Sequence, residues 1–307
     1  MQTTTLGKTG LEVTRLGVGL SETGFNLTEA DMDQASSVIN DALDSGINFL
    51  DTAACYDRSE EQIGRAVSHR RDEYVLATKA GHFLPRNQGQ DWTYEVISES
   101  IDRSLRRMKT DHVDLLQLHS CSVEILEKGE VIRALEDARA AGKTRFIGYS
   151  GDNANAEWAV NSGLFDTLQT SFNLVDQKAR RTLFPKAERQ GMGVIVKRPI
   201  GNAVWGAQQD PHPYSHNPTY TEEYYRRAGV MQAEGPLPGD PGDRILLAMG
   251  YTFAHPEVDV AIIGTQRPAH MRSNVDLVNN RLPISPDAVQ ALESRYDKFA
   301  SDWEQRG

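Results

Sequence analysis

Short apolar runs alternate with helical patterns along almost the whole sequence, and this alternation restricts the fold more than any other feature. It is typical of an α/β protein with a parallel sheet, because parallel neighbouring strands need a helical crossover between them. Eight such units in 307 residues fit a (β/α)8 TIM barrel better than a six-stranded doubly wound sheet. The predicted strands are 16–19, 47–51, 74–79, 113–118, 144–149, 167–170, 194–197 and 260–263.

Three segments lie outside this alternation. Residues 1–14 hold two short runs around a glycine-rich turn, which predicts a hairpin that caps the bottom of the barrel. Residues 206–242, after the seventh strand, are polar and rich in Pro, His and Tyr, so we expect a long loop that is a lid, a binding loop, disorder or a tolerated surface insertion. Residues 285–305 predict a C-terminal helix, and residues 1–307 predict a single domain.

Composition excludes several classes of partner. The 33 Lys and Arg against 43 Asp and Glu give a net charge of −10, so no basic excess is present to bind nucleic acid. No apolar window of about 18 residues is long enough to cross a membrane. The first eight residues lack the apolar core of a secretory signal, and the two cysteines are too few for a disulfide scaffold. We expect a cytoplasmic protein without nucleic-acid or membrane partners, and the sequence leaves its oligomeric state open.

Four titratable side chains fall at or after the carboxyl ends of three consecutive predicted strands, where barrels carry their chemistry. Asp51 and Lys79 end the second and third strands, Tyr56 follows Asp51 by five residues, and His119 follows the fourth strand. A phenol with a pKa of about 10 becomes a useful acid when a nearby ammonium stabilises its anion, and a buried ammonium needs a carboxylate. Each residue alone has an ordinary structural explanation, but together they predict a proton donor for a carbonyl, or a base for the reverse reaction.

The residues around these positions resemble one known family. The segment Phe49–Gly64 carries Asp-Thr-Ala, Tyr56 and a Ser-Glu pair followed by Gly, and it resembles the signature of the aldo-keto reductases. Val75–Lys79 is similar to the family's lysine strand, and Asp114–His119 is similar to its fourth strand. The resemblance extends from Leu6 to about Val278 and is nearest to bacterial branches of the family.

The resemblance implies a (β/α)8 barrel that interconverts an aldehyde or ketone and an alcohol with a nicotinamide cofactor. It makes Tyr56 the general acid/base, Asp51 and Lys79 the pair that lowers its pKa, and His119 the donor that orients the carbonyl. The expected partner is a small carbonyl or alcohol substrate of unspecified identity.

The resemblance also implies where the cofactor binds. Pro268 suits the first turn of a helix that follows the eighth strand, and such a helix N-terminus is a natural phosphate site. Arg267 suits a 2′-phosphate, which favours NADP(H), although NAD(H) stays open. The expected cofactor-binding residues are Ser150, Gln169, Lys197, Pro199, Gly264, Thr265, Arg267 and Asn274.

Three positions depart from the commoner pattern of the family. Gly151 stands where Asn usually follows the serine, Lys197 replaces an aromatic residue that often stacks on nicotinamide, and His270 replaces a frequent Arg. Lys197 retains an aliphatic stem that is able to cover the ring. These departures leave the choice between NADP and NAD open.

Other residues keep further interpretations open. Trp92, Cys121 and Trp205 are expected to contact the substrate, with packing as the alternative. A cofactor-binding regulatory or sensor protein with little turnover is one alternative function, and a metal-dependent barrel hydrolase or isomerase is another. Asp51, Glu60 and His119 are metal-ligand types, but no His-x-His spacing is present and His82 is isolated, so we expect no metal site.

Overall fold

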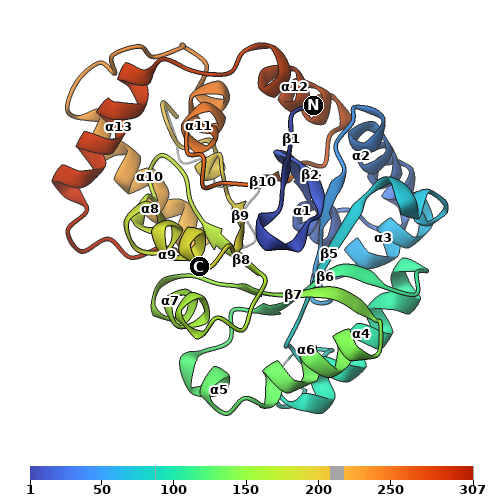
Figure 1. Ribbon diagram of the computed structural model, residues 1–307. Helices are drawn as coiled ribbons and strands as arrows, with labels where there is room; N and C mark the ends of the chain where they lie inside the picture. The colour runs from blue at the N-terminus through green and yellow to red at the C-terminus, as the bar shows by residue number, and fades with distance from the viewer. Residues whose placement is uncertain (87, 208–217, 307) are drawn as a thin grey trace.

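Eight parallel strands close into a barrel in the order β10-β3-β4-β5-β6-β7-β8-β9 (Figure 1). The computed structural model describes residues 1–86, 88–207 and 218–306. The predicted (β/α)8 TIM barrel is confirmed, and every predicted strand is present with its bounds shifted by two residues at most. The barrel strands are β3 Leu16–Gly19, β4 Phe49–Asp51, β5 Val75–Ala80, β6 Val113–His119, β7 Thr144–Ser150, β8 Thr167–Ser171, β9 Gly193–Lys197 and β10 Val260–Ile263.

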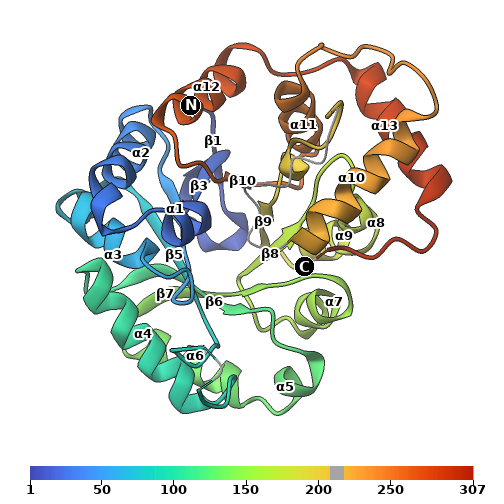
Figure 2. The ribbon, with the colours of Figure 1, turned by 180° about the vertical axis from the view of Figure 1, so that it is seen from behind.

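Helices form a ring around the strands (Figures 1 and 2). The helix α2 shows why they form here: Thr28 and Asp31 make a reciprocal capping box before it, and its apolar positions at helical spacing are buried. The helices are α1 Ser21–Asn26, α2 Met32–Asp44, α3 Ser59–Ala66, α4 Tyr94–Met108, α5 Val123–Glu127, α6 Glu130–Ala140, α7 Asn153–Ser162, α8 Lys178–Thr182, α9 Phe184–Arg189, α10 Pro218–Gln232, α11 Arg244–Phe253, α12 Pro268–Asn280 and α13 Pro286–Phe299. Within the described residues, no helix combines the length and the apolar character needed to cross a bilayer.

The N-terminal hairpin closes one end of the barrel, as predicted. Strand β1 (Thr3–Thr5) pairs antiparallel with β2 (Glu12–Thr14), and the turn between them contains Leu6, which is fully buried in the cluster that fills the barrel. A Cβ on Gly193 would lie 2.8 Å from the Leu6 side chain, so only glycine leaves room for this plug. The hairpin therefore seals the end opposite the strands' carboxyl termini.

Two predicted boundaries are wrong. The segment 206–242 is not a continuous irregular loop, because Pro218–Gln232 forms α10. This helix packs against α13. Residues 208–217 of the segment lie outside the described residues. The C-terminal helix ends at Phe299 instead of residue 305. After it the chain returns to the barrel mouth, where the Gln305 amide donates to the Ser171 carbonyl oxygen at 2.7 Å.

Truncation of the barrel plug should destabilise the protein. We expect Leu6→Ala to lower the free energy of unfolding by about 2–5 kcal/mol, because a fully buried leucine leaves a cavity. Leu164→Ala, at a leucine that is 44% exposed, is the control and should cost less than about 0.5 kcal/mol. Urea unfolding measures both, and equal losses would contradict the role of Leu6.

Candidate active site

A buried ion pair lies at the carboxyl ends of β4 and β5. The Lys79 ammonium lies 2.6 Å from Asp51 Oδ2 and donates to the Thr52 carbonyl oxygen at 2.8 Å. The Lys79 and Asp51 side chains are 1% and 2% exposed. Burial by itself would lower the pKa of Lys79, but the charge and hydrogen bond of Asp51, together with the charge interactions of Tyr56 and Cys55, outweigh it, and the pKa lies above its usual value. Lys79 therefore remains a cation in a site that water does not reach.

Polar side chains from more distant strands hold the free oxygen of Asp51. Strand register places Ser150 beside His119 on one side and Gln169 on the other. The Gln169 amide donates to Asp51 Oδ1 at 2.7 Å, and the Ser150 hydroxyl donates to Gln169 Oε1 at 2.9 Å. A hydrogen-bonded chain thus runs across the mouth from β7 through β8 to the ion pair.

Tyr56 follows β4 in a tight turn and lies over the ion pair. Its ring centroid is 4.9 Å from the Lys79 ammonium, and its hydroxyl is 3.5 Å from Nε2 of His119. Burial raises the pKa of Tyr56, and the Lys79 charge acts in the expected, lowering direction but offsets only part of that rise. The phenol is protonated at neutral pH, as a proton donor must be.

His119 ends β6 with its two ring nitrogens facing different partners. Nε2 faces the Tyr56 hydroxyl, whereas Nδ1 lies 3.3 Å from Cys55 Sγ. Burial, followed by the nearby Lys79 charge, lowers the pKa of His119 well below its usual value. The imidazole is therefore neutral and carries one N–H, which is able to donate to a carbonyl oxygen. The four predicted catalytic side chains thus meet at one end of the barrel.

The residues expected to bind the cofactor line the ends of β7 to β10 and the helix α12. The Lys197 ammonium is 2.8 Å from Asp152 Oδ2, and the Pro199 carbonyl oxygen accepts from Thr252. Gly264 and Thr265 follow β10 and lead to Arg267, which is the N-cap of α12. The Arg267 side chain is exposed, whereas Asn274 lies buried within the helix. Pro268 occupies the first turn of α12, as predicted.

The structure explains the departure at Gly151. A Cβ at this position would lie 2.6 Å from the ring of Tyr149, whose hydroxyl donates to the Cys121 carbonyl oxygen at 2.7 Å. The tyrosine ring fills the space that a side chain at position 151 would need. An asparagine cannot enter here without movement of Tyr149.

The three expected substrate contacts have different environments. Trp92 is half-buried, with its ring 4.9 Å from that of His82 near the mouth. Cys121 and Trp205 are instead buried in the main core, 1% and 6% exposed. Their burial supports a packing role rather than the substrate contact that we expected.

Two residues beside the four predicted catalytic side chains are absent from the set of site residues predicted from the sequence. His82 lies three residues after Lys79, and its ring centroid is 5.4 Å from that of His119. The position of His82 just past the end of a predicted strand was the sequence signal that could have marked it as a site residue. Phe25, from α1, is 42% exposed and lies 5.6 Å from the Tyr56 ring, and no sequence pattern marks it.

Comparison with known proteins decides the family. The sequence model of the aldo/keto reductase family matches residues 15–297. The chain belongs to the aldo/keto reductase family. It is therefore an oxidoreductase of the carbonyl–alcohol type, in agreement with the predicted class.

Relatives agree over nearly their whole length. An uncharacterized oxidoreductase of Bacillus subtilis, YqkF, is 28% identical, with 94% of each chain covered. The L-galactose dehydrogenase of Arabidopsis thaliana is 29% identical, over 92% of this chain and 89% of that protein. The holo form of the aldo-keto reductase AKR11C1 from Bacillus halodurans superposes with a TM-score of 0.80 at 26% identity, with 96% of both chains covered.

The buried ion pair yields a stability prediction. Asp51→Asn should lower the free energy of unfolding by about 3–5 kcal/mol, because it leaves the Lys79 ammonium buried without a counter-charge. The double variant Asp51→Leu/Lys79→Met should be more stable than Asp51→Asn. Asp102→Asn, which breaks the exposed pair with Lys143, is the control and should cost roughly 0–1 kcal/mol. Urea unfolding measures the free energy of unfolding of each variant. A similar loss in Asp51→Asn and in Asp102→Asn would contradict the importance of the buried ion pair.

Proposed function

We propose that the chain is an NAD(P)H-dependent oxidoreductase that interconverts an aldehyde or ketone and an alcohol, with Tyr56 as general acid/base. One observation carries the proposal: the Tyr56 hydroxyl lies 3.5 Å from His119 Nε2, while its ring covers the buried Lys79 ammonium. Family membership supports the reaction class. The proposed substrate is a small carbonyl compound or alcohol, and we retain the cytoplasm as the proposed location.

In the reducing direction the residues act on the carbonyl oxygen. His119 donates its Nε2–H to that oxygen and orients it, and Tyr56 transfers the phenolic proton to it. A nicotinamide cofactor, when bound, would supply the hydride for the carbonyl carbon, and with the proton from Tyr56 this would give the alcohol. The phenolate left on Tyr56 is stabilised by Lys79, which the carboxylate of Asp51 keeps in place. In the oxidising direction the same phenolate accepts the proton of the alcohol.

The donor set after β10 fits the anionic end of such a cofactor. The helix α12 has 13 residues, and its N-terminal N–H groups together with the exposed Arg267 guanidinium favour a phosphate. Ser150 and Gln169 present polar groups near the proposed catalytic residues, since Gln169 donates to Asp51 Oδ1 and Ser150 donates to Gln169. The guanidinium supports NADP(H) over NAD(H) because it is able to bind a 2′-phosphate through two N–H groups. The similar Bacillus halodurans structure is a holo form, which is consistent with a cofactor on this barrel.

Removal of the proposed acid tests the chemistry. We expect Tyr56→Phe to lower kcat by roughly 10²–10⁴-fold, because the carbonyl oxygen loses its proton donor. NADPH binding, followed by nicotinamide fluorescence, should change little because only a hydroxyl is lost. Undiminished carbonyl reduction by the variant would overturn the assignment. A cofactor-bound protein without turnover over a panel of aldehydes and ketones would instead favour the regulatory alternative.

Cofactor choice is tested at Arg267. Arg267→Gln should weaken NADPH binding by about tenfold or more, since a charge-assisted hydrogen bond contributes about 1.5–3 kcal/mol. NADH binding should change much less because that cofactor lacks the 2′-phosphate. Arg281→Gln, at the other end of α12 where Arg281 pairs with Asp243, is the control. Equal effects on both cofactors would contradict an interaction with the 2′-phosphate.

A further inference from the structure

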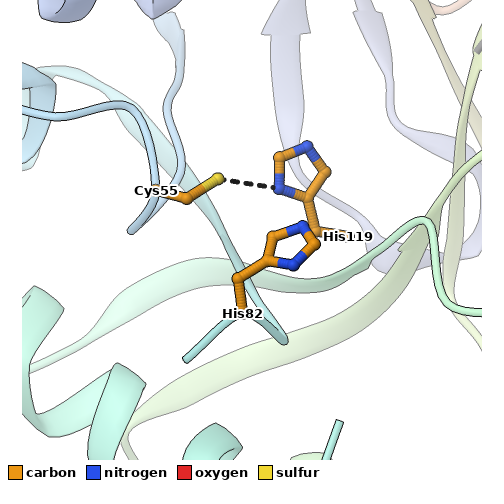
Figure 3. Close-up of side chains that lie close together, drawn as sticks. All are labelled: Cys55, His82 and His119. Carbon is orange, nitrogen blue, oxygen red and sulfur yellow. Dashed lines mark hydrogen bonds between the residues drawn. The ribbon is translucent and has the colours of Figure 1, made fainter. Parts of the chain in front are cut away.

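Three metal-ligating side chains meet at the mouth of the barrel beside the catalytic group. Cys55 follows β4, His82 follows β5 and His119 ends β6, so adjacent strands bring them together (Figure 3). Their ligand atoms lie within 4.8 Å of one another. We propose that Cys55, His82 and His119 form a binding site for one Zn²⁺ ion, and that an ion bound there inhibits the reaction.

The donor atoms suit zinc. One thiolate and two imidazoles are borderline-soft ligands, and three protein ligands with one open position are typical of zinc sites that also take water or substrate. With Zn–S of about 2.3 Å and Zn–N of about 2.1 Å, the S···N edge of a tetrahedron is about 3.6 Å. The separation of Cys55 Sγ and His119 Nδ1 is already 3.3 Å. His82, which is half-buried, places its ligand atom within 4.8 Å of the other two.

A carboxylate orients His82 as in established metal sites. Asp91 Oδ2 lies 2.8 Å from Nδ1 of His82, while Asp91 Oδ1 accepts from the Phe83 backbone N–H. In Figure 3 the other ring nitrogen of His82 points toward His119. A carboxylate on the outer nitrogen of a histidine fixes the ring and makes the inner nitrogen a stronger ligand. His82 is thus held with its second ring nitrogen toward His119 (Figure 3).

The charges around the cluster allow a cation. The cations Lys79, Lys197 and Arg86 all act on His119. Asp51 and Asp152 lie 2.6 and 2.8 Å from the two lysines and compensate their charges, and Asp91 interacts with Arg86. Asp91 and the Cys55 thiolate would add negative charge next to the ion. On binding, the thiol proton leaves to solvent as the S–Zn bond forms, and no electron is transferred.

Inhibition follows from the position of His119. A metal on Nδ1 fixes this ring, whose Nε2 lies 3.5 Å from the Tyr56 hydroxyl, and brings a divalent charge close to the proton donor. The open coordination position then competes for the carbonyl oxygen that His119 and Tyr56 would bind. This part of the inference rests on the proposed function, whereas binding of the metal does not.

Spectroscopy of the full chain tests the site directly. We titrate the protein with Co²⁺ in the presence of a phosphine reductant and then displace it with Zn²⁺. One equivalent should produce a thiolate-to-cobalt charge-transfer band, which Zn²⁺ abolishes. Cys55→Ser should abolish the band, and His82→Gln should weaken binding by roughly tenfold or more. Thermal unfolding and circular dichroism confirm that each variant is folded.

Two control variants locate the site. Cys121→Ala removes the other thiol, which is buried in the core, and His112→Gln removes an imidazole outside the cluster. Neither should change the band or the affinity. Absence of the band, its persistence in Cys55→Ser, or unchanged affinity in His82→Gln would overturn the site.

Activity tests the second half of the inference. Zn²⁺ should inhibit carbonyl reduction competitively with the carbonyl substrate, a chelator should reverse it, and His82→Gln should need roughly tenfold more Zn²⁺ for the same fractional inhibition. Metal binding without inhibition would refute the inhibitory role. Lack of turnover without added metal would refute the proposed function, while the cobalt spectrum would still decide the site.

Discussion

The ion pair between Lys79 and Asp51 is the interaction on which the mouth of the barrel depends. Neither charge reaches water, so each is stable only while the other is present. Asp51 also accepts from Gln169, four strands away from β4, and thereby ties opposite sides of the mouth together. Because the same pair lies under the Tyr56 ring, the interactions that keep this end folded also place a cation beside the phenol that we propose as proton donor.

Much of the fold could be predicted because barrel strands are buried on both faces and appear in the sequence as short apolar runs. The helix α10 escaped prediction because a charged residue interrupts its apolar face. Tyr224, Ala228 and Met231 are buried in the core, but Arg227 lies fully buried among them, 2.9 Å from Glu223 and 3.7 Å from Asp176. A buried arginine hides the apolar periodicity of so short a helix. The return of Gln305 to the mouth depends on partners such as Ser171, 134 positions earlier in the chain, which no local pattern indicates.

The meeting of the four proposed catalytic residues was predictable for a different reason. Asp51, Lys79 and His119 stand at strand ends, and parallel strands present those ends at one edge. Loop residues lack such a rule, which is why Trp205 was expected at the mouth but lies in the core. Burial also shifts pKa values by an amount that cannot be read from the residue types in the sequence. Lys79 was expected to lower the pKa of Tyr56, but loss of solvent outweighs it.

The close approach of Gly151 and Tyr149 has an evolutionary consequence. Because the tyrosine ring occupies the space beside Gly151, the two positions are coupled, and a side chain is accepted at 151 only after the ring at 149 has been reduced or moved. The order of substitutions therefore matters: asparagine first gives a clash, whereas a smaller residue at 149 first gives a cavity that the asparagine then fills. An asparagine at position 151 is therefore reached only through an intermediate with a weakened core.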